Sequence, residues 1–162
     1  MSRVALIGAL PQSLINFRGD LLKALVESGN EVTAMAARSG ESVGEQLALL
    51  GVNYRTYPVQ RNGLNPAKDI HTFFALFNAL GELQPDVVLA YTIKPVIWGG
   101  IALIRKPNIR FFALITGLGF SFQESRSFIR RSLTLLVTWL YRMSLSRASR
   151  VIFQNSDNRD FF

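Results

Sequence analysis

The chain opens on an uninterrupted apolar run, Val4-Ala5-Leu6-Ile7-Gly8-Ala9. An apolar run without alternation is typical of a strand that is buried on both faces, as in the parallel sheets of α/β proteins. The residues that follow place leucines at helical spacing and end at Gly29, a common helix stop. We therefore predict a strand over residues 4–9 and a helix over residues 16–28.

The same alternation of short apolar runs and helical patterns continues to the end of the chain. Further strands are expected at residues 31–37, 53–59, 86–91, 110–116 and 150–155. Further helices are expected at residues 42–50, 66–83, 96–104 and 127–146, with Asn65 as the cap of the second of these. Strands that alternate with helices build βαβ units and a mostly parallel sheet. The sequence predicts one Rossmann-like, doubly wound α/β domain over residues 1–162, with residues 53–59 nearer a sheet edge.

Composition narrows the class of protein further. The chain has 162 residues, of which 49% are apolar, and it has no cysteine. The apolar content excludes a disordered chain, and the lack of cysteine excludes a disulfide scaffold and thiolate metal sites. A bilayer-spanning helix needs about 20 consecutive apolar residues, and the best runs are interrupted or too short. We expect a cytoplasmic chain that touches a membrane surface.

Charge is distributed unevenly along the chain. The net charge is +7, yet residues 1–54 carry four basic and five acidic residues. Residues 105–150 carry nine basic residues against Glu124 alone. A basic segment of this kind can attract phosphates, anionic lipid or nucleic acid. The alternative is that it forms a solvated basic face. No helix-turn-helix, RRM or KH signature is present, so we expect no nucleic-acid partner.

Candidate binding residues fall in the loops that follow the expected strands, where doubly wound sheets bind their ligands. The first loop lacks GxGxxG and P-loop motifs, but it leads into a helix whose amides can bind an anion. Two glycines after the fifth strand allow close backbone approach. A plain connection is the alternative for each loop. The candidates, in chain order, are Asn16, Arg18, Gly19, Lys94, Thr116, Gly117 and Gly119.

Motifs for metal or triad chemistry are absent from the sequence. His71 is the only histidine, and no DxD, HExxH or EF-hand pattern occurs. One histidine cannot build a metal site, and it leaves no Ser-His-Asp arrangement. We therefore expect neither a bound metal nor a cofactor.

The helix expected at residues 127–146 has an unusually wide apolar face. One stripe comprises Ile129, Leu133, Leu136, Leu140 and Met143, widened by Phe128, Leu135 and Trp139. A helix packed on the sheet explains this pattern, but aromatics beside arginines also suit a membrane interface. The candidate membrane-surface residues are Arg130, Arg131, Trp139 and Arg142.

Five segments, taken in order, resemble a known family. They are Phe17-Arg18-Gly19-Asp20-Leu21-Leu22, Arg61-Asn62-Gly63-Leu64-Asn65-Pro66, Thr92-Ile93-Lys94-Pro95, Thr116-Gly117-Leu118-Gly119-Phe120 and Val151-Ile152-Phe153-Gln154-Asn155. Together they resemble the N-terminal domain of family 4 glycosyltransferases with the GT-B fold. The likeness is greatest to bacterial enzymes of O-antigen, capsule and lipid-linked glycan assembly.

The resemblance implies a function that the composition does not show. Such enzymes are retaining transferases whose N-terminal domain receives the acceptor, often a polyprenyl-diphosphate sugar at the inner membrane. Their C-terminal domain holds the nucleotide-sugar with an E-x7-E motif, which this sequence lacks. The resemblance thus implies an N-terminal half, inactive by itself, that is peripheral on the inner membrane and has the nucleotide-sugar as co-substrate rather than a cofactor.

Site residues follow from the same resemblance. The Arg18-Gly19 loop would lie near the donor diphosphate or the transferred sugar. Lys94 and the turn from Thr116 to Gly119 would line the acceptor side, and Arg61 and Asn62 would lie on the edge of the cleft. A cleft histidine that is frequent in the family has no counterpart here, so no catalytic residue is assigned. The alternative is a non-catalytic Rossmann-like subunit that partners a separate donor-binding chain.

Overall fold

A computed structural model of the chain describes residues 1–38, 40–60, 63, 65–117 and 128–154. Within these residues, six parallel strands form one sheet in the order β3-β2-β1-β4-β5-β6. The strands are β1 (Arg3–Ile7), β2 (Glu31–Ala36), β3 (Asn53–Thr56), β4 (Val87–Tyr91), β5 (Arg110–Ile115) and β6 (Arg150–Phe153). The predicted doubly wound, parallel α/β fold is confirmed, as is the edge position of the third strand.

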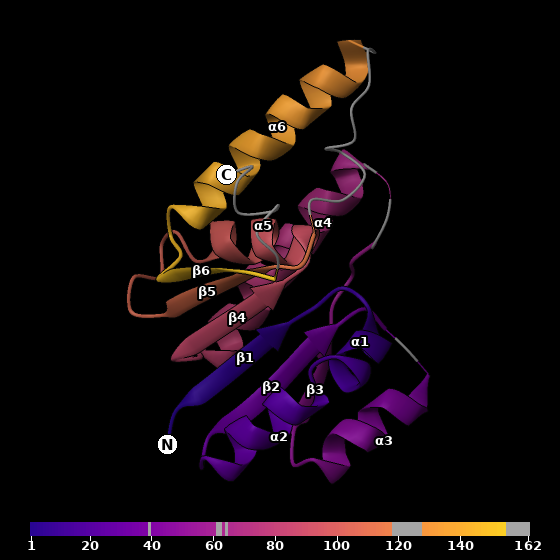
Figure 1. Cartoon of the computed structure of the whole chain (residues 1–162), viewed down its shortest axis with the longest axis vertical. Helices are drawn as coiled ribbons and strands as arrows, with labels where there is room; N and C mark the ends of the chain where they lie inside the picture. The colour runs from indigo at the N-terminus through magenta and orange to yellow at the C-terminus, as the bar shows by residue number, and fades with distance from the viewer. Residues whose placement is uncertain (39, 61–62, 64, 118–127, 155–162) are drawn as a thin grey trace.

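Helices cover both faces of this sheet (Figure 1). One layer consists of α1 (Pro11–Asn16), α2 (Gly19–Glu27) and α3 (Glu41–Leu49). The other layer consists of α4 (Pro66–Leu83), α5 (Ile93–Ala102) and α6 (Phe128–Leu145). In Figure 1 the first half of α6 projects beyond the sheet, whereas its second half lies over α5.

The side chains of β1 enter two separate hydrophobic clusters, one on each face of the sheet. Leu6 belongs to a cluster with Leu14 and Leu22 of the α1–α3 layer, and all three are fully buried. Ile7, the next residue, belongs to a second cluster with Leu76 of α4 and Phe111 of β5. Successive side chains of a strand point to opposite faces, so an apolar run without alternation is what a sheet covered on both sides requires.

The helix predicted over residues 16–28 is wrong in its first turn. Helix α1 was not predicted, and α2 begins only at Gly19, because Phe17 and Arg18 leave helical geometry with φ of −120° and −130°. The break lets Leu14 of α1 and Leu22 of α2 both enter the same core. Burial of two leucines, at about 1.5–3 kcal/mol each, outweighs the loss of one helical turn.

The helix predicted over residues 96–104 begins earlier, at Ile93. Lys94 and Pro95 therefore lie in its first turn rather than in a loop. Proline is tolerated there because the first N–H groups of a helix have no intrahelical partner.

The face of α6 that packs inward also differs from the prediction. Val137, Tyr141 and Ser144 are buried against α5 and the sheet, and Leu140 packs partly against that core. Leu136, expected in the buried stripe, is 52% exposed. Ser144 Oγ donates a hydrogen bond to the carbonyl of Val96 at 2.6 Å, so a polar contact sets the rotation of the helix.

Gly100 makes this close packing of α5 and α6 possible. A Cβ added there would overlap the Ser144 side chain and lie 2.8 Å from Phe111 Cε1. Arg147, directly after α6, donates to the carbonyls of Leu103, Lys106, Pro107 and Ile109 at 2.8–3.2 Å. One of the nine basic residues counted in residues 105–150 is thus engaged by backbone rather than available to a ligand.

Candidate site at the switch point of the sheet

The candidate site lies at the carboxyl ends of β1 and β4, which are neighbours in the centre of the sheet. From β1 the chain proceeds to β2 on one side, whereas β4 continues toward β5 on the other. This reversal of strand order is the topological switch point, where doubly wound folds bind ligands. The segments that border it are the turn after β1 and the start of α5.

Gly8 and Tyr91 fit together at this point. A Cβ on Gly8 would overlap the Tyr91 ring, lying 2.7 Å from its Cε1. The Tyr91 hydroxyl lies 2.7 Å from Ser13 Oγ of α1, and this contact is buried. Burial raises the pKa of Tyr91, and the hydrogen bond between Tyr91 and Ser13 and the charge of Arg18 lower it in part. Tyr91 therefore stays a neutral, fixed platform.

Arg18 lies on that platform. Its guanidinium carbon is 5.0 Å from the centroid of the Tyr91 ring, and Nη1 donates to the carbonyl of Phe17 at 2.8 Å. Its Nε is buried and has no hydrogen-bond partner among the described residues. Arg18 is also the N-cap residue of α2, so its backbone lies at the amide end of a helix. Both features favour a negatively charged ligand.

Thr92 connects β4 to α5 in a strained conformation. Its φ of 68° and ψ of 162° lie outside the regions that residues with a side chain prefer. Such strain costs roughly 1–3 kcal/mol and is concentrated at functional sites. Thr92 Oγ1 is buried without a partner among the described residues, and it does not cap α5. The amides at the start of α5 thus lack a side-chain cap.

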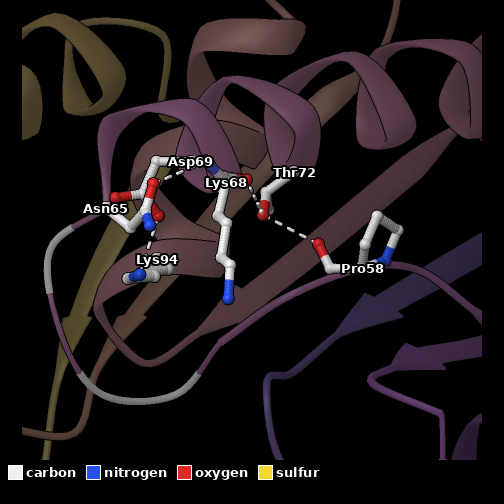
Figure 2. Close-up of polar contacts among 6 residues, drawn as sticks. All are labelled: Pro58, Asn65, Lys68, Asp69, Thr72 and Lys94. Atoms are coloured by element: carbon white, nitrogen blue, oxygen red, sulfur yellow. Dashed lines mark hydrogen bonds and ion pairs between the residues drawn. The ribbon is translucent and has the colours of Figure 1, made fainter.

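Lys94 forms a buried ion pair with Asp69 of α4. Its Nζ lies 2.7 Å from Asp69 Oδ1, and each side chain is 12% exposed (Figure 2). The start of α4 is itself fixed, because the Asn65 side chain accepts a hydrogen bond from the amide of Lys68, as predicted. Thr72 Oγ1 lies 2.7 Å from the carbonyl of Pro58, which ties α4 to the segment after β3.

The sequence analysis missed Asp69. An acidic residue in the first turn of a helix is ordinary, because it complements the helix dipole. Nothing in the local pattern shows that this carboxylate is buried or that it faces a lysine 25 positions later in the chain. The pair also changes the interpretation of Lys94, whose charge is largely compensated by Asp69 rather than free for an incoming anion.

Comparison with known proteins identifies the family. Residues 19–161 match the family model described as Glycosyltransferase Family 4.

The chain belongs to glycosyltransferase family 4.

One curated relative is similar to this chain over nearly its whole length. It is the N,N'-diacetylbacillosaminyl-diphospho-undecaprenol alpha-1,3-N-acetylgalactosaminyltransferase of Campylobacter jejuni, which is 28% identical over 159 residues. The match covers 98% of this chain and 42% of that protein, so the chain spans less than half of the relative's length.

Solved structures share the fold of this family 4 chain. MurG of Acinetobacter baumannii superposes with a TM-score of 0.60 at 16% identity, over 94% of this chain and 41% of that one. A UDP-N-acetylglucosamine 2-epimerase superposes with a TM-score of 0.61 at 13% identity, over 98% of this chain and 43% of that one. The second protein is named for a different reaction, so at these identities the likeness shows the fold alone.

The predicted site residues of the family 4 domain separate into distinct groups. Arg18 lies at the switch point, and Gly19 is the first residue of α2. Thr116 and Gly117 directly follow β5, the neighbour of β4, and are half-buried. Asn16 is exposed at the end of α1, where its side chain accepts from Gln12 at 3.3 Å, so it does not begin a helix.

Other predicted residues lie elsewhere or outside the description. Arg61, Asn62 and Gly119 lie outside the described residues. Arg130 and Arg131 belong to α6, but their side chains are not described. Trp139 is 57% exposed on the same helix, and Arg142 is exposed one turn later. Among the described residues, no helix is both long and apolar enough to cross a bilayer.

Proposed function

We propose that this chain is the acceptor-side domain of a retaining glycosyltransferase, which moves a sugar from a nucleotide-sugar to a lipid-linked or polysaccharide acceptor. The observation that carries the proposal is the similarity, over 98% of the chain, to an enzyme named for transfer to a diphospho-undecaprenol-linked sugar. On this proposal the residues that hold most of the nucleotide-sugar lie outside these 162 residues.

The switch point supplies a chemical role for this domain. Transfer from a nucleotide-sugar leaves a diphosphate whose negative charge grows as the bond to the sugar breaks. A cation and uncapped helix amides that are already in position stabilise such charge, because they need little reorganisation. Arg18, fixed over Tyr91, and the start of α5 at Thr92 are the groups suited to this task. Thr116, Gly117 and Gly119 remain proposed contacts of the acceptor.

Lys94 has an indirect part in this proposal. Its ion pair with Asp69 fixes the start of α5 against the start of α4. The pair thereby positions the amides that follow Thr92 at the switch point. We propose that Lys94 serves the acceptor side mainly through this positioning.

A binding experiment tests the proposal. The chain is titrated calorimetrically with a short-chain, water-soluble polyprenyl diphosphate in the absence of membrane. We expect Arg18→Gln to weaken binding about ten-fold or more, because a charge-assisted contact contributes roughly 1.5–3 kcal/mol. Arg110→Gln is the matched control, since Arg110 is exposed at the opposite, amino end of β5. Equal affinity of the Arg18 variant and the unsubstituted chain would refute the proposed site.

A turnover assay tests whether this chain can transfer sugar by itself. We expect these 162 residues to transfer no sugar from a nucleotide-sugar alone, since the donor contacts are assigned outside them. Transfer that depends only on this chain would contradict the acceptor-side assignment.

A further inference from the structure

Helix α4 carries an exposed apolar stripe that the sequence analysis did not single out. The stripe comprises Ile70, Phe74 and Phe77, which are 54%, 55% and 38% exposed. Their spacing of four and three residues places them on one face of the helix. Ile70 directly follows Asp69, so the stripe begins beside the ion pair at the edge of the candidate site.

Aromatic packing holds the stripe outward. The Phe73 ring lies 5.2 Å from Phe74 and 6.1 Å from Phe77, and 6.3 Å from Trp98 of α5, measured between ring centroids. Phe73 is partly buried against the core and contacts Trp98 of α5, whereas Phe74 and Phe77 remain exposed. Large apolar side chains kept at the surface in this way point to an interaction site rather than to incomplete packing.

Basic groups flank the stripe. Lys106, on the connection between α5 and β5, places its ammonium 5.0 Å from the centre of the Phe77 ring and 3.4 Å from the Phe77 carbonyl. Arg105 and Lys68 are exposed near its two ends. A lysine that lies along aromatic surface can keep its stem apolar and direct its charge to a polar headgroup.

Acidic groups on this side of the sheet are already engaged. Residues 65–117 contain three acidic residues, and residues 128–154 contain none. Asp69 pairs with Lys94, Glu82 pairs with Arg55, and Asp86 accepts from the amide of Arg3. This side of the domain therefore has an excess of basic residues beside its apolar stripe, and its charge complements an anionic surface.

We propose that the Ile70–Phe74–Phe77 stripe of α4, with Lys106 beside it, docks the protein on an anionic lipid surface. The inference rests on the proposed function, which places the acceptor in a membrane, and it names the surface that reaches that membrane. The aromatic rings lie in the interfacial region while the basic groups meet lipid phosphates. Docking through α4 brings the lipid beside Asp69 and Lys94, where the candidate site begins.

Vesicle partitioning tests the docking surface. The chain is co-sedimented with vesicles of phosphatidylcholine that do or do not contain phosphatidylglycerol. We expect Phe74→Glu to lower partitioning on the anionic vesicles at least ten-fold, and Lys106→Gln to lower it about five-fold. Leu49→Glu is the matched control, because Leu49 is 87% exposed on α3 in the opposite layer. Loss of binding in the control as well, or full binding by the Phe74 variant, overturns the proposal.

A fluorescence measurement does not depend on loss of binding. Trp98 and Trp139 are the only tryptophans, so replacing both by Phe gives a silent background. In that background Phe74→Trp or Leu49→Trp introduces a single reporter, and brominated lipids quench a reporter that enters the bilayer. We expect quenching at position 74 and none at position 49. Quenching at neither position, or at both, contradicts docking through α4.

Two further outcomes separate this inference from others. If Phe74→Glu leaves vesicle binding intact but changes the sedimenting mass, the stripe contacts protein and the lipid proposal is wrong. If Trp139→Glu abolishes vesicle binding while Phe74→Glu does not, α6 alone makes the membrane contact. Binding of the soluble polyprenyl diphosphate is measured without membrane, so its failure refutes the proposed function and not the docking surface.

Discussion

The two helical layers of this domain each bury an apolar cluster against the same sheet, yet their outer surfaces and internal contacts differ. The α1–α3 layer exposes acidic residues, namely Asp20, Glu27 and Glu45. Its ion pair, Lys23 with Glu27, spans 3.9 Å with both side chains at least 60% exposed. The α4–α6 layer instead buries the Asp69–Lys94 pair and packs α5 on α6 through Gly100. The α4–α6 layer therefore differs from the α1–α3 layer by a larger buried apolar cluster and by these polar and close contacts.

The largest expected effect on the free energy of unfolding comes from removing the lysine of each ion pair, Asp69–Lys94 and Lys23–Glu27, in separate variants. Lys94→Met leaves the buried Asp69 carboxylate without its partner, and we expect the free energy of unfolding to fall by about 3–5 kcal/mol. Lys23→Met in the other layer should cost at most about 0.5 kcal/mol, since exposed helix pairs contribute little. Urea denaturation measures both.

The double variant Asp69→Leu with Lys94→Met sharpens this test. Replacing both charges by apolar groups removes the unpaired carboxylate, so we expect most of the lost stability to return. A Lys94 variant as stable as the unsubstituted chain would show that Lys94 does not support the start of α5.

Glycine substitutions give the next largest effect. Gly100→Ala forces α5 away from Ser144 and Phe111, and we expect a loss of about 1–3 kcal/mol from overpacking. Gly44→Ala in α3 is the matched change, because its Cβ would lie 3.6 Å from Tyr54 Cδ1, an ordinary contact. There the gain in helix propensity, about 0.5–1 kcal/mol, should stabilise the chain. Equal signs for the two variants in thermal denaturation would contradict the close α5–α6 packing.

The smallest expected effect is on how the free energy of unfolding depends on alkaline pH. Burial raises the pKa of Tyr57 well above 10.0, its ordinary value, and burial likewise raises the pKa of Tyr91. Near pH 10 these tyrosines lose their protons in the unfolded chain but keep them in the folded chain. The free energy of unfolding therefore falls as pH rises. Tyr57→Phe should make this decline shallower between about pH 9 and about pH 11, measured by urea denaturation.

Near neutral pH, Tyr57→Phe should also lower the free energy of unfolding, which is measured separately. Tyr57→Phe removes a hydrogen bond of 2.7 Å from its hydroxyl to the carbonyl of Gly8. We expect a loss of about 0.5–1.5 kcal/mol. An unchanged decline at alkaline pH would show that Tyr57 is not protected from titration in the folded state.

Sequence reasoning was most reliable where a pattern is local. The apolar run at residues 4–9, the stop at Gly29 and the cap at Asn65 each depend on neighbouring residues, and together they led to a doubly wound sheet. It also placed Arg18 in a loop at the carboxyl edge. It did not foresee the break at Phe17, because residues 16–28 have continuous helical spacing and the break is favoured only by the core beneath.

By itself the sequence determined the order of the strands and of the helices other than α1, the buried character of the sheet and the basic second half. Strand and helix periodicity and net charge are properties that a linear pattern contains. Only the tertiary structure decided that Lys94 pairs with Asp69, that Arg147 is engaged by four backbone carbonyls, and that Phe74 is exposed. The reason is physical: burial and charge pairing depend on residues that are distant in the chain and meet only when the helices pack on the sheet.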